Sequence, residues 1–235
     1  MALLETAFQP TFMETMAYIF LSLFFSFFSH SNKSFSNNGV IFGNIVGFLV
    51  FFLGGIQGFS ALAVFFALGE FATIHSRKKT SHDHEQRTSL NIAGNAGAGI
   101  IALMFSNYAA FFGSISAALS DTLSSEIGLL SKKNPRLITN MKEAAPGTDG
   151  AVTILGFAGA FFGALVISVV HLFFFGSPMV AFFIFLGGVA GTVVDSFLGA
   201  IFQQKKLLDN NQVNFIATAS GAIVVFALQA LTLGA

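Results

Sequence analysis

Four acidic residues stand inside long apolar segments of this chain, namely Glu70, Asp121, Glu126 and Asp195. A carboxylate at membrane depth is energetically expensive and usually functional. No Lys or Arg shares their segments, and carboxylates are oxygen ligands that suit Mg²⁺. We predict that Asp121 and Asp195 bind Mg²⁺, with Glu126 as an additional candidate. Glu70 stands seven residues before Arg77, so a locally paired or snorkelling acid explains it equally well.

Two polar stripes have helical spacing. One consists of Arg87, Asn91 and Asn95, and the other of Asp195, Gly199 and Gln203. Residues four apart share one helix face. Gly199 leaves a gap where a ligand or another backbone can approach closely. Ordinary hydrogen bonds between helices would also explain both stripes. Asp121 and Glu126 face one site only if their helix bends or ends, because five residues turn an ideal helix by roughly 140°.

The long connection 130–150 contains Pro146-Gly147-Thr148-Asp149-Gly150, directly before a helix expected to begin near Ala151. A glycine-rich turn at a helix N-terminus presents backbone N–H groups to an anion such as phosphate. Basic residues surround it, namely Lys132, Lys133, Arg136 and Lys142. Together with buried acids, these parts suit phosphoryl or nucleotidyl transfer. The turn lacks the Lys-Ser/Thr of a P-loop.

Other catalytic or metal-binding patterns are weak. Residues 82–84 read His-Asp-His, but without a third ligand nearby we expect a solvated loop rather than a metal site. The chain has no cysteine, which excludes disulfides and thiol chemistry. Its net charge is zero, so nothing indicates a nucleic-acid partner.

The elements that must position these residues are apolar helices. The chain is 54% apolar and 9% charged, against roughly 25% charged in soluble domains. We therefore expect one all-α integral membrane domain over residues 1–235. Eight segments are predicted, over 12–29, 39–55, 58–75, 89–105, 107–129, 151–174, 179–203 and 212–233. A hairpin turn is expected at Gly54-Gly55, and a weaker break at Ser106-Asn107.

Every Lys and Arg falls in four loops that alternate along the chain, around residues 33, 77–87, 132–142 and 205–206. The positive-inside rule places such loops in the cytoplasm. Eight crossings keep all four loops on that side and both termini on the other. Seven crossings would move the third loop across, so seven is the less favoured alternative.

Several blocks resemble one integral-membrane family long catalogued as a domain of unknown function, which includes phytyl-phosphate kinases. They are Ser120-Asp121-Thr122, Ser125-Glu126-Ile127-Gly128, Pro135-Arg136-Leu137-Ile138-Thr139, Pro146 to Gly150, Asp195-Ser196 with Gly199-Ala200 and Gln203, and Leu208-Asp209-Asn210-Asn211 with Val213-Asn214. The similarity covers about residues 34–233. Ala151 and Asn91 depart from the family pattern, and the chain lacks a Cys-rich insert that many members carry.

This resemblance implies a Mg²⁺-dependent polyprenyl-phosphate kinase, which transfers a phosphoryl group from a nucleoside triphosphate to an isoprenoid monophosphate. A more distant similarity to phosphatidate cytidylyltransferase and dolichol kinase favours CTP as donor, with ATP as the alternative. Asp121, Glu126 and Asp195 are the expected metal ligands, and Arg87 and Lys142 the expected neutralising cations. Phosphate or ribose contacts are expected from Asn91, Asn95, Arg136, Gly147, Thr148, Gly150, Ser196, Gln203, Asp209, Asn210 and Asn214.

Two other functions fit the same composition. Acids within spans and glycine-broken helices also mark ion or solute transporters. A structural or lipid-binding membrane protein is the third possibility, although it leaves the intramembrane acids unexplained. The kinase is favoured because the polar residues gather near one end of the predicted helices.

Overall fold

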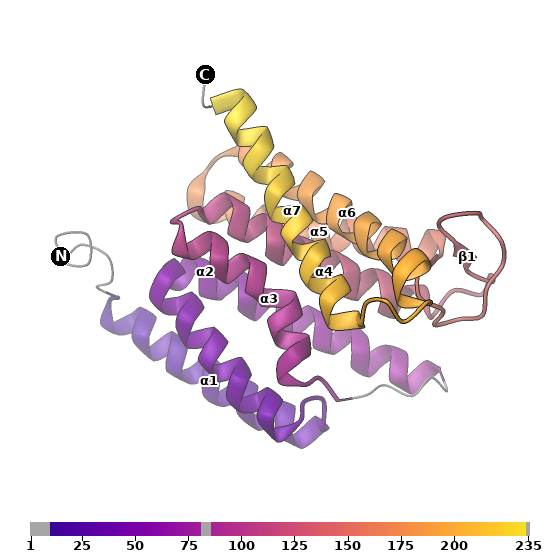
Figure 1. The fold of residues 1–235 in the computed structure, drawn as a ribbon. Coiled ribbons are helices and arrows are strands. Elements are labelled where there is room, and N and C mark those ends of the chain that lie inside the picture. The colour runs from indigo at the N-terminus through magenta and orange to yellow at the C-terminus, as the bar shows by residue number, and fades with distance from the viewer. Residues whose placement is uncertain (1–9, 81–85, 234–235) are drawn as a thin grey trace.

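The computed structural model describes residues 10–80 and 86–233, so the His-Asp-His sequence at 82–84 lies outside the described residues. Figure 1 shows a bundle of helices with one long loop at its end. The helices are α1 (Phe12–Asn32), α2 (Asn37–Lys79), α3 (Ser89–Met104), α4 (Tyr108–Gly128), α5 (Ile154–Phe175), α6 (Pro178–Leu198) and α7 (Asn210–Leu233). A π-helical turn (Gly199–Gln203) extends α6, and two short strands, β1 (Arg136–Leu137) and β2 (Ala151–Val152), pair in the long loop.

Helix α2 is folded in half. Gly55 has φ 62° and ψ −164°, a backbone conformation that essentially only glycine adopts. A methyl group placed on Gly47 would lie 3.5 Å from the Phe59 ring, whereas twelve residues of straight helix would separate them by about 18 Å. The two halves therefore run back along each other, which confirms the hairpin turn predicted at Gly54-Gly55.

The break between α3 and α4 also lies where the sequence predicts it. Ser106 has φ 56°, and the Asn107 side chain accepts a hydrogen bond from the Ala110 amide at 2.9 Å, which caps α4. With α2 counted as two halves, the eight predicted segments correspond to eight helical stretches in the described part of the chain. The sixteen-residue α3 is shorter than the roughly 20 residues that a full crossing needs.

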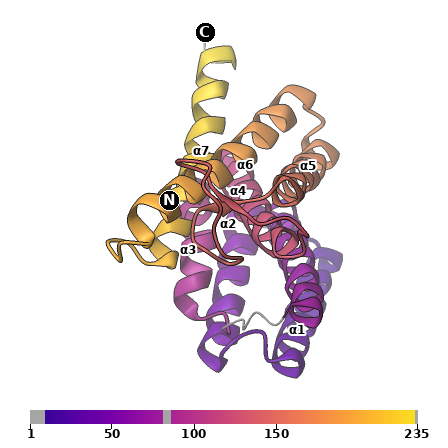
Figure 2. The same ribbon diagram turned by 90° about the vertical axis from the view of Figure 1, so that its right-hand side faces the viewer.

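Helix α4 is the centre of the bundle. It packs against α2, α3, α5, α6 and α7, and Figure 2, which looks from the β1 end, shows it near the middle with α1 at the edge. Phe111, Phe112, Ile115 and Leu119 on α4 are completely buried. In the described residues, five helices are long and apolar enough to cross a membrane: α1, α2, α5, α6 with its π-turn, and α7. The all-α integral membrane class is thus confirmed, whereas the number of crossings stays a prediction.

Small residues allow α5 to approach the backbone of α4. A methyl group on Gly159 would meet the Leu123 carbonyl oxygen at 2.6 Å, and one on Gly163 would meet the Ser120 amide nitrogen at 2.9 Å. Close backbone approach through small residues is how helices associate in lipid, where burial of apolar surface gives no advantage. This contact fixes the part of α4 that carries Asp121.

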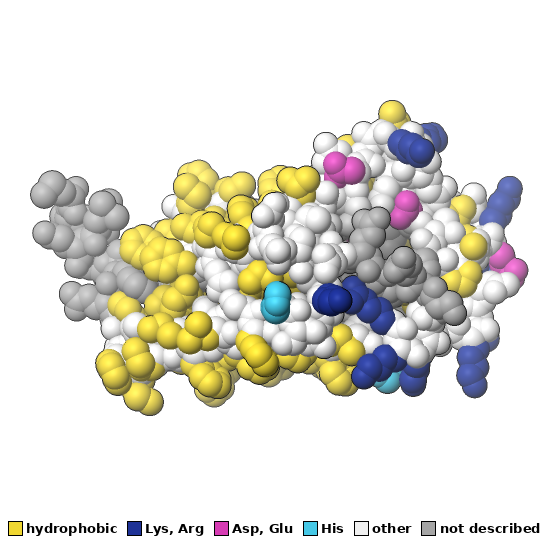
Figure 3. Space-filling view, turned by 90° about the horizontal axis from the view of Figure 1, so that it is seen from below, with side chains coloured by type: hydrophobic (Ala, Val, Ile, Leu, Met, Phe, Trp, Pro, Cys, Tyr) yellow, Lys and Arg dark blue, Asp and Glu magenta, His cyan; other side chains and the backbone are white. Residues whose placement is uncertain are grey.

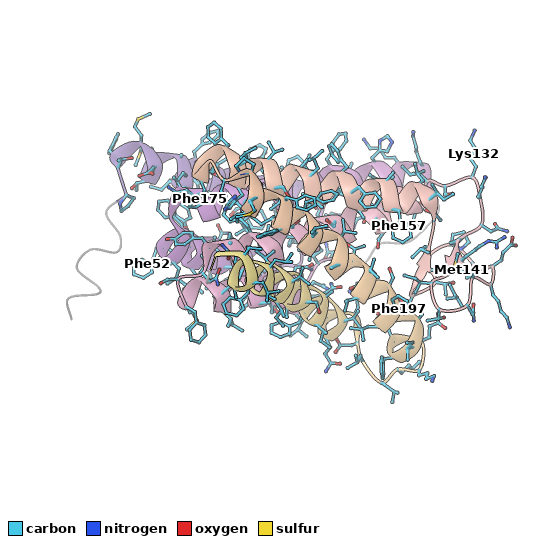
Figure 4. All side chains as sticks on the ribbon, turned by 90° about the horizontal axis from the view of Figure 1, so that it is seen from above. Phe52, Lys132, Met141, Phe157, Phe175 and Phe197 are labelled. Atoms are coloured by element: carbon cyan, nitrogen blue, oxygen red, sulfur yellow. The ribbon has the colours of Figure 1, made fainter. Side chains whose placement is uncertain are left out.

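The four basic loops lie at one end of the bundle. The Ser36 amide donates to the Arg87 carbonyl at 3.1 Å. Asn91 at the start of α3 donates to Asn211 at the start of α7. Gln203, in the π-helical turn after α6, donates to Asp149 in the 130–150 loop. Lys and Arg side chains gather at one end of the face seen in Figure 3. In Figure 4, Lys132 and Met141 lie at one end, and Phe52 and Phe175 at the other. Which end faces the cytoplasm stays a prediction.

Candidate functional site

Asp121 on α4 and Asp195 on α6 lie side by side near the loop end of the bundle. Their carboxyl groups are close enough to share a hydrogen bond. Two ionised carboxylates repel each other at this distance, so the pair requires either a shared proton or a bound cation. The structure thus brings together the two acids that the sequence predicted to act together.

The pair borders a cavity of about 420 Å³ between the ends of α4 and α6 and the 130–150 loop. Eight further residues of the predicted site line this cavity with the two aspartates: Glu126, Gly147, Thr148, Gly150, Ser196, Gln203, Asn210 and the gap residue Gly199. Segments from both halves of the sequence therefore converge on this cavity.

The stripe Asp195, Gly199 and Gln203 holds the loop in place. A methyl group on Gly199 would lie 2.9 Å from the Gly150 amide nitrogen, so the gap admits another backbone, one of the two possibilities expected for it. Gln203 Nε2 donates to Asp149 Oδ1 at 2.9 Å, and Gln204 Nε2 donates to the Asp149 carbonyl at 2.7 Å. The π-helical turn lies at this contact, and π-turns are frequent at functional sites.

The expected helix start near Ala151 is wrong by three residues. Ala151 and Val152 form β2, which pairs with β1, and α5 begins at Ile154 with Thr153 as its cap. The physical reason is that Thr153 can accept a hydrogen bond from the Gly156 amide, at 2.9 Å, whereas Gly150 cannot cap with a side chain. The 147–150 turn therefore lines the cavity without forming the first turn of α5.

The basic residue that lines the cavity is Lys133 rather than Arg136 or Lys142. Arg136 pairs with Glu143 at 3.6 Å on the exposed side of the loop, and Lys142 is exposed. Neither side chain lines the cavity, so the described geometry gives no support for their predicted roles at the phosphates.

Glu126 points its carboxylate away from the aspartate pair. It accepts hydrogen bonds from Thr73 Oγ1, at 2.8 Å, and from Ser76 Oγ, both on the second half of α2. Helix α4 continues through Gly128, so the two acids stay on different faces. Among the described residues no group of three metal-capable side chains is present. The described geometry pairs Asp121 with Asp195 and holds the Glu126 carboxylate against α2, so Glu126 as an additional metal ligand stays a prediction without support from these contacts.

Arg87, in the connection before α3, is a buried cation near two of the four acids, Glu70 and Glu126. Its backbone is held beside Phe35 by a parallel bridge, which directs the side chain between the helices. Its Nη2 donates to Thr73 Oγ1 at 3.1 Å, and its charge interacts with Glu70 and Glu126. Burial lowers the pKa of Arg87, while the two acids raise it. Glu70 is buried, accepts a hydrogen bond from Ser34 Oγ, and lies near the Arg87 charge rather than forming the local pair considered for Arg77. Arg87 does not line the aspartate cavity.

Asparagines connect the start of α3 to the aspartate pair. Asn91 Nδ2 donates to Asn211 Oδ1 at 2.6 Å, and Asn95 Nδ2 donates to the Asn91 carbonyl. Asn214, with its amide oriented to satisfy its neighbours, donates to Asp195 Oδ2 at 3.2 Å. By contrast, Asp209 caps α7 through the Gln212 amide at 2.9 Å and does not line the cavity, so its predicted contact with the nucleotide is not supported.

Three residues in or beside the site were given no role of their own in the sequence analysis: Lys133 and Asp149, which line the cavity, and Asn211, which binds Asn91. Asp149 stands inside the Pro146 to Gly150 block and interacts electrostatically with Asp195. Its partial burial raises the pKa of Asp149 above the usual value for a carboxyl group. The signal that could have identified it was its place between two glycines of a turn already assigned to phosphate.

The donor set fits Mg²⁺. Asp121 and Asp195 lie side by side on the wall of the cavity, whereas Asp149 accepts a hydrogen bond from Gln203. One basic side chain, Lys133, also lines the cavity. Mg²⁺ in phosphotransferases is typically bound through one or two carboxylates plus substrate phosphates, with water completing the shell. The Asp121–Asp195 pair would hold the ion, which supplies charge neutralisation for phosphate oxygens.

Comparison with known proteins agrees with the sequence blocks. The family model described as Integral membrane protein DUF92 matches residues 20–222. The "Uncharacterized membrane protein MJ0933" of Methanocaldococcus jannaschii is 34% identical over 228 residues, 90% of this chain and 94% of that protein. From Arabidopsis thaliana, "Protein VTE6, chloroplastic" is 28% identical over 83% of this chain and 65% of its own length. "Protein PGR" is 27% identical over 89% of this chain and 93% of its own length. No solved structure matches. The chain thus belongs to the DUF92 family of integral membrane proteins.

Proposed function

We propose that this protein is a membrane-embedded polyprenyl-phosphate kinase. It transfers the terminal phosphoryl group of a nucleoside triphosphate, CTP or ATP, to an isoprenoid monophosphate and releases the nucleoside diphosphate. Two facts support this: the sequence blocks resemble those of phytyl-phosphate kinases, and the relatives include Protein VTE6.

The observation that carries the proposal is the Asp121–Asp195 pair in a cavity that it shares with the 147–150 turn and Lys133. Adjacent carboxylates suit a divalent cation, and Lys133 and backbone amides suit phosphate oxygens. A purely structural role would not require two like-charged groups in contact.

The chemistry demands little from the protein beyond positioning. An oxygen of the acceptor phosphate attacks the γ-phosphorus, and the bond from that phosphorus to the bridging β–γ oxygen breaks. The acceptor is already an anion, so no strong general base is needed. Holding the two phosphates in line and neutralising their charge supply most of the rate in such reactions.

The cavity lies at the end of the bundle that carries the basic loops, so the proposal places it on the cytoplasmic side, where nucleotides are available. Asp121 and Asp195 bind Mg²⁺ in this proposal, and Lys133 contacts the donor phosphates. Asn210 and Asn214 orient phosphate or ribose oxygens beside Asp195.

The decisive experiment uses purified protein, Mg²⁺, γ-labelled CTP or ATP and phytyl phosphate in detergent or liposomes. We expect labelled phytyl diphosphate from the wild type and a loss on the order of 100-fold or more from Asp121→Asn or Asp195→Asn. Glu143→Gln is the matched control, because it changes an exposed acid of the 130–150 loop in the same way. This variant should retain activity. Wild-type transfer that persists in both aspartate variants would refute the assignment. Solute flux in liposomes without nucleotide would favour a transporter instead.

A further inference from the structure

A second cavity lies between α1, both halves of α2, and α3, on the side of the bundle away from α5 and α6. It has a volume of about 160 Å³. Its walls are mainly apolar. The lining residues include the aromatic Phe25, Phe59, Phe65 and Phe66 and the aliphatic Ala63 and Ile92. The function proposed above assigns no role to these residues.

The cavity has polar groups at its loop end. Arg87, Asn91 and Asn95 line it there. Asn44 lies deeper in the cavity, and its side-chain amide already has hydrogen-bond partners within the protein. Its Nδ2 donates to Ser26 Oγ on α1 and to the Val40 carbonyl, both at 2.9 Å. A ligand that fits is therefore apolar over most of its length and polar at one end.

The polar end is adjacent to the aspartate cavity. Asn91, which lines the apolar cavity, donates to Asn211 Oδ1 at 2.6 Å. A methyl group on Gly94 would meet the Asn211 carbonyl oxygen at 2.7 Å and Asn214 Cβ at 3.3 Å, so α3 and α7 touch here. Asn214 in turn donates to Asp195. Two asparagines thus separate the head of such a ligand from the carboxylate pair.

The cavity is open towards lipid along α1. Leu21 and Phe24 line it and are 36% and 49% exposed, and α1 packs mainly on α2. The lining positions from Phe59 to Ala67 span about 12 Å of helix rise. A chain can therefore enter from the bilayer and lie along the helices.

We infer that this cavity binds the first part of the isoprenoid tail of the acceptor, so that its phosphate extends past Asn91 towards Asp195. This inference rests on the proposed kinase function and names the subsite for its lipid substrate. An apolar cavity of about 150 Å³ holds a benzene-sized molecule. The present one is of similar size, which suits one or two isoprene units of a single chain and leaves no room for two acyl tails side by side.

Apolar burial gives little affinity here, because bilayer lipid is as apolar as the cavity. The cavity contributes by positioning the reacting phosphate. Blocking it therefore lowers the rate with every prenyl phosphate, whereas adding isoprene units beyond the second has little effect, because those units extend into lipid.

The direct test is photocrosslinking with a prenyl phosphate that carries a diazirine in its first isoprene unit, followed by peptide mass spectrometry. A diacyl phosphatidic acid with a diazirine near its head is the comparison probe. We expect the prenyl probe to label residues 59–67 and 92–96, and phosphatidic acid to label them at least tenfold less. Labelling that lies elsewhere, or equal labelling by both probes, overturns the inference.

The variant Ala63→Phe fills the cavity, and Ala227→Phe on the exposed side of α7 makes the same change facing lipid. Ala63→Phe should lower prenyl-probe labelling and transfer at least tenfold, and Ala227→Phe should change neither. Cavity labelling by the prenyl probe without any transfer would refute the kinase but keep the lipid site. Transfer that is unchanged in a folded Ala63→Phe protein, with labelling elsewhere, would refute the site but keep the kinase.

Discussion

The backbone of Gly150 packs directly against the backbone of Gly199. A methyl group on Gly150 would lie 2.3 Å from the Ala200 amide nitrogen, and Gly150 has φ 72°. Neither position can hold a side chain while this contact exists. The contact thus connects the loop that carries the 147–150 turn to the helix that carries Asp195.

Gly199→Ala is therefore expected to push the loop away from α6. Transfer should fall by tenfold or more, because displacements of about 1 Å at a reacting centre cost on the order of 100-fold in rate. The bundle should remain folded, since the loop is outside its core. Kinetics and thermal unfolding of the purified variant measure both effects.

Gly58→Ala is the matched control, since a methyl group there meets its nearest neighbours at 3.4 Å or more. It should leave transfer unchanged. Equal losses in the two variants would show that the Gly150–Gly199 contact has no special role.

Mg²⁺ should stabilise the protein through the aspartate pair. A ligand that binds only the folded state raises the unfolding temperature, with a gain of about 2.7 kcal/mol at one hundred times its dissociation constant. Asp121→Asn should abolish the rise caused by Mg²⁺. It should also raise the stability of the metal-free protein, because one of two repelling charges is removed. A Mg²⁺-dependent rise that survives in the Asp121→Asn/Asp195→Asn double variant would place the metal elsewhere.

The Arg87 cluster should be structural rather than catalytic. Glu70 is 1% exposed, and removing the positive partner of a buried acid typically costs 3–5 kcal/mol, so we expect about 3 kcal/mol for Arg87→Gln. Adding Glu70→Gln should restore part of that loss. Thermal unfolding of the single and double variants measures both the loss of stability and its recovery.

Arg136→Gln is the comparison for this cluster, because the Arg136–Glu143 pair is more than half exposed on both sides. Such surface pairs contribute about 0–1 kcal/mol. If Arg87→Gln unfolds at the wild-type temperature but loses transfer, Arg87 has the catalytic role that its sequence position first indicated.

These residues show which features of the site could be read from the sequence. The α2 hairpin and the α3–α4 break were predictable because Gly55 and Asn107 act locally, through backbone conformation and capping. Asp121 and Asp195 were predictable because a carboxylate in an apolar segment needs a function.

The partners of Arg87 and Glu126 could not be predicted in the same way. Arg87 precedes α3 in the sequence, and its backbone bridge to Phe35 and its interaction with Glu70 join it to distant segments. Likewise, Lys133 lines the cavity and Lys142 does not, which depends on how the 130–150 loop folds against the ends of α4 and α6. Such contacts join distant segments, and no local pattern encodes them.

Asp149 gives the site a pH dependence that can be measured as stability. Burial raises the folded pKa of Asp149, so the folded state binds a proton more tightly than the unfolded state. Its contribution to stability is therefore greatest below the unfolded pKa and is lost as the pH rises through the folded pKa. Asp149→Asn keeps an oxygen for Gln203 without the charge. It should raise the unfolding temperature slightly at pH 7, and this advantage should vanish at acidic pH. An advantage that grows on acidification contradicts the assignment.

The orientation of the bundle can be tested directly, because the chain has no cysteine of its own. Asn140→Cys places a thiol in the basic 130–150 loop, and Ser106→Cys places one in the turn between α3 and α4. Both positions are exposed. If the basic loops are cytoplasmic, a membrane-impermeant maleimide added to intact cells labels Ser106→Cys at once and Asn140→Cys only after permeabilisation. The reverse pattern would put the aspartate cavity on the side without nucleotides, which is incompatible with a kinase supplied from the cytoplasm.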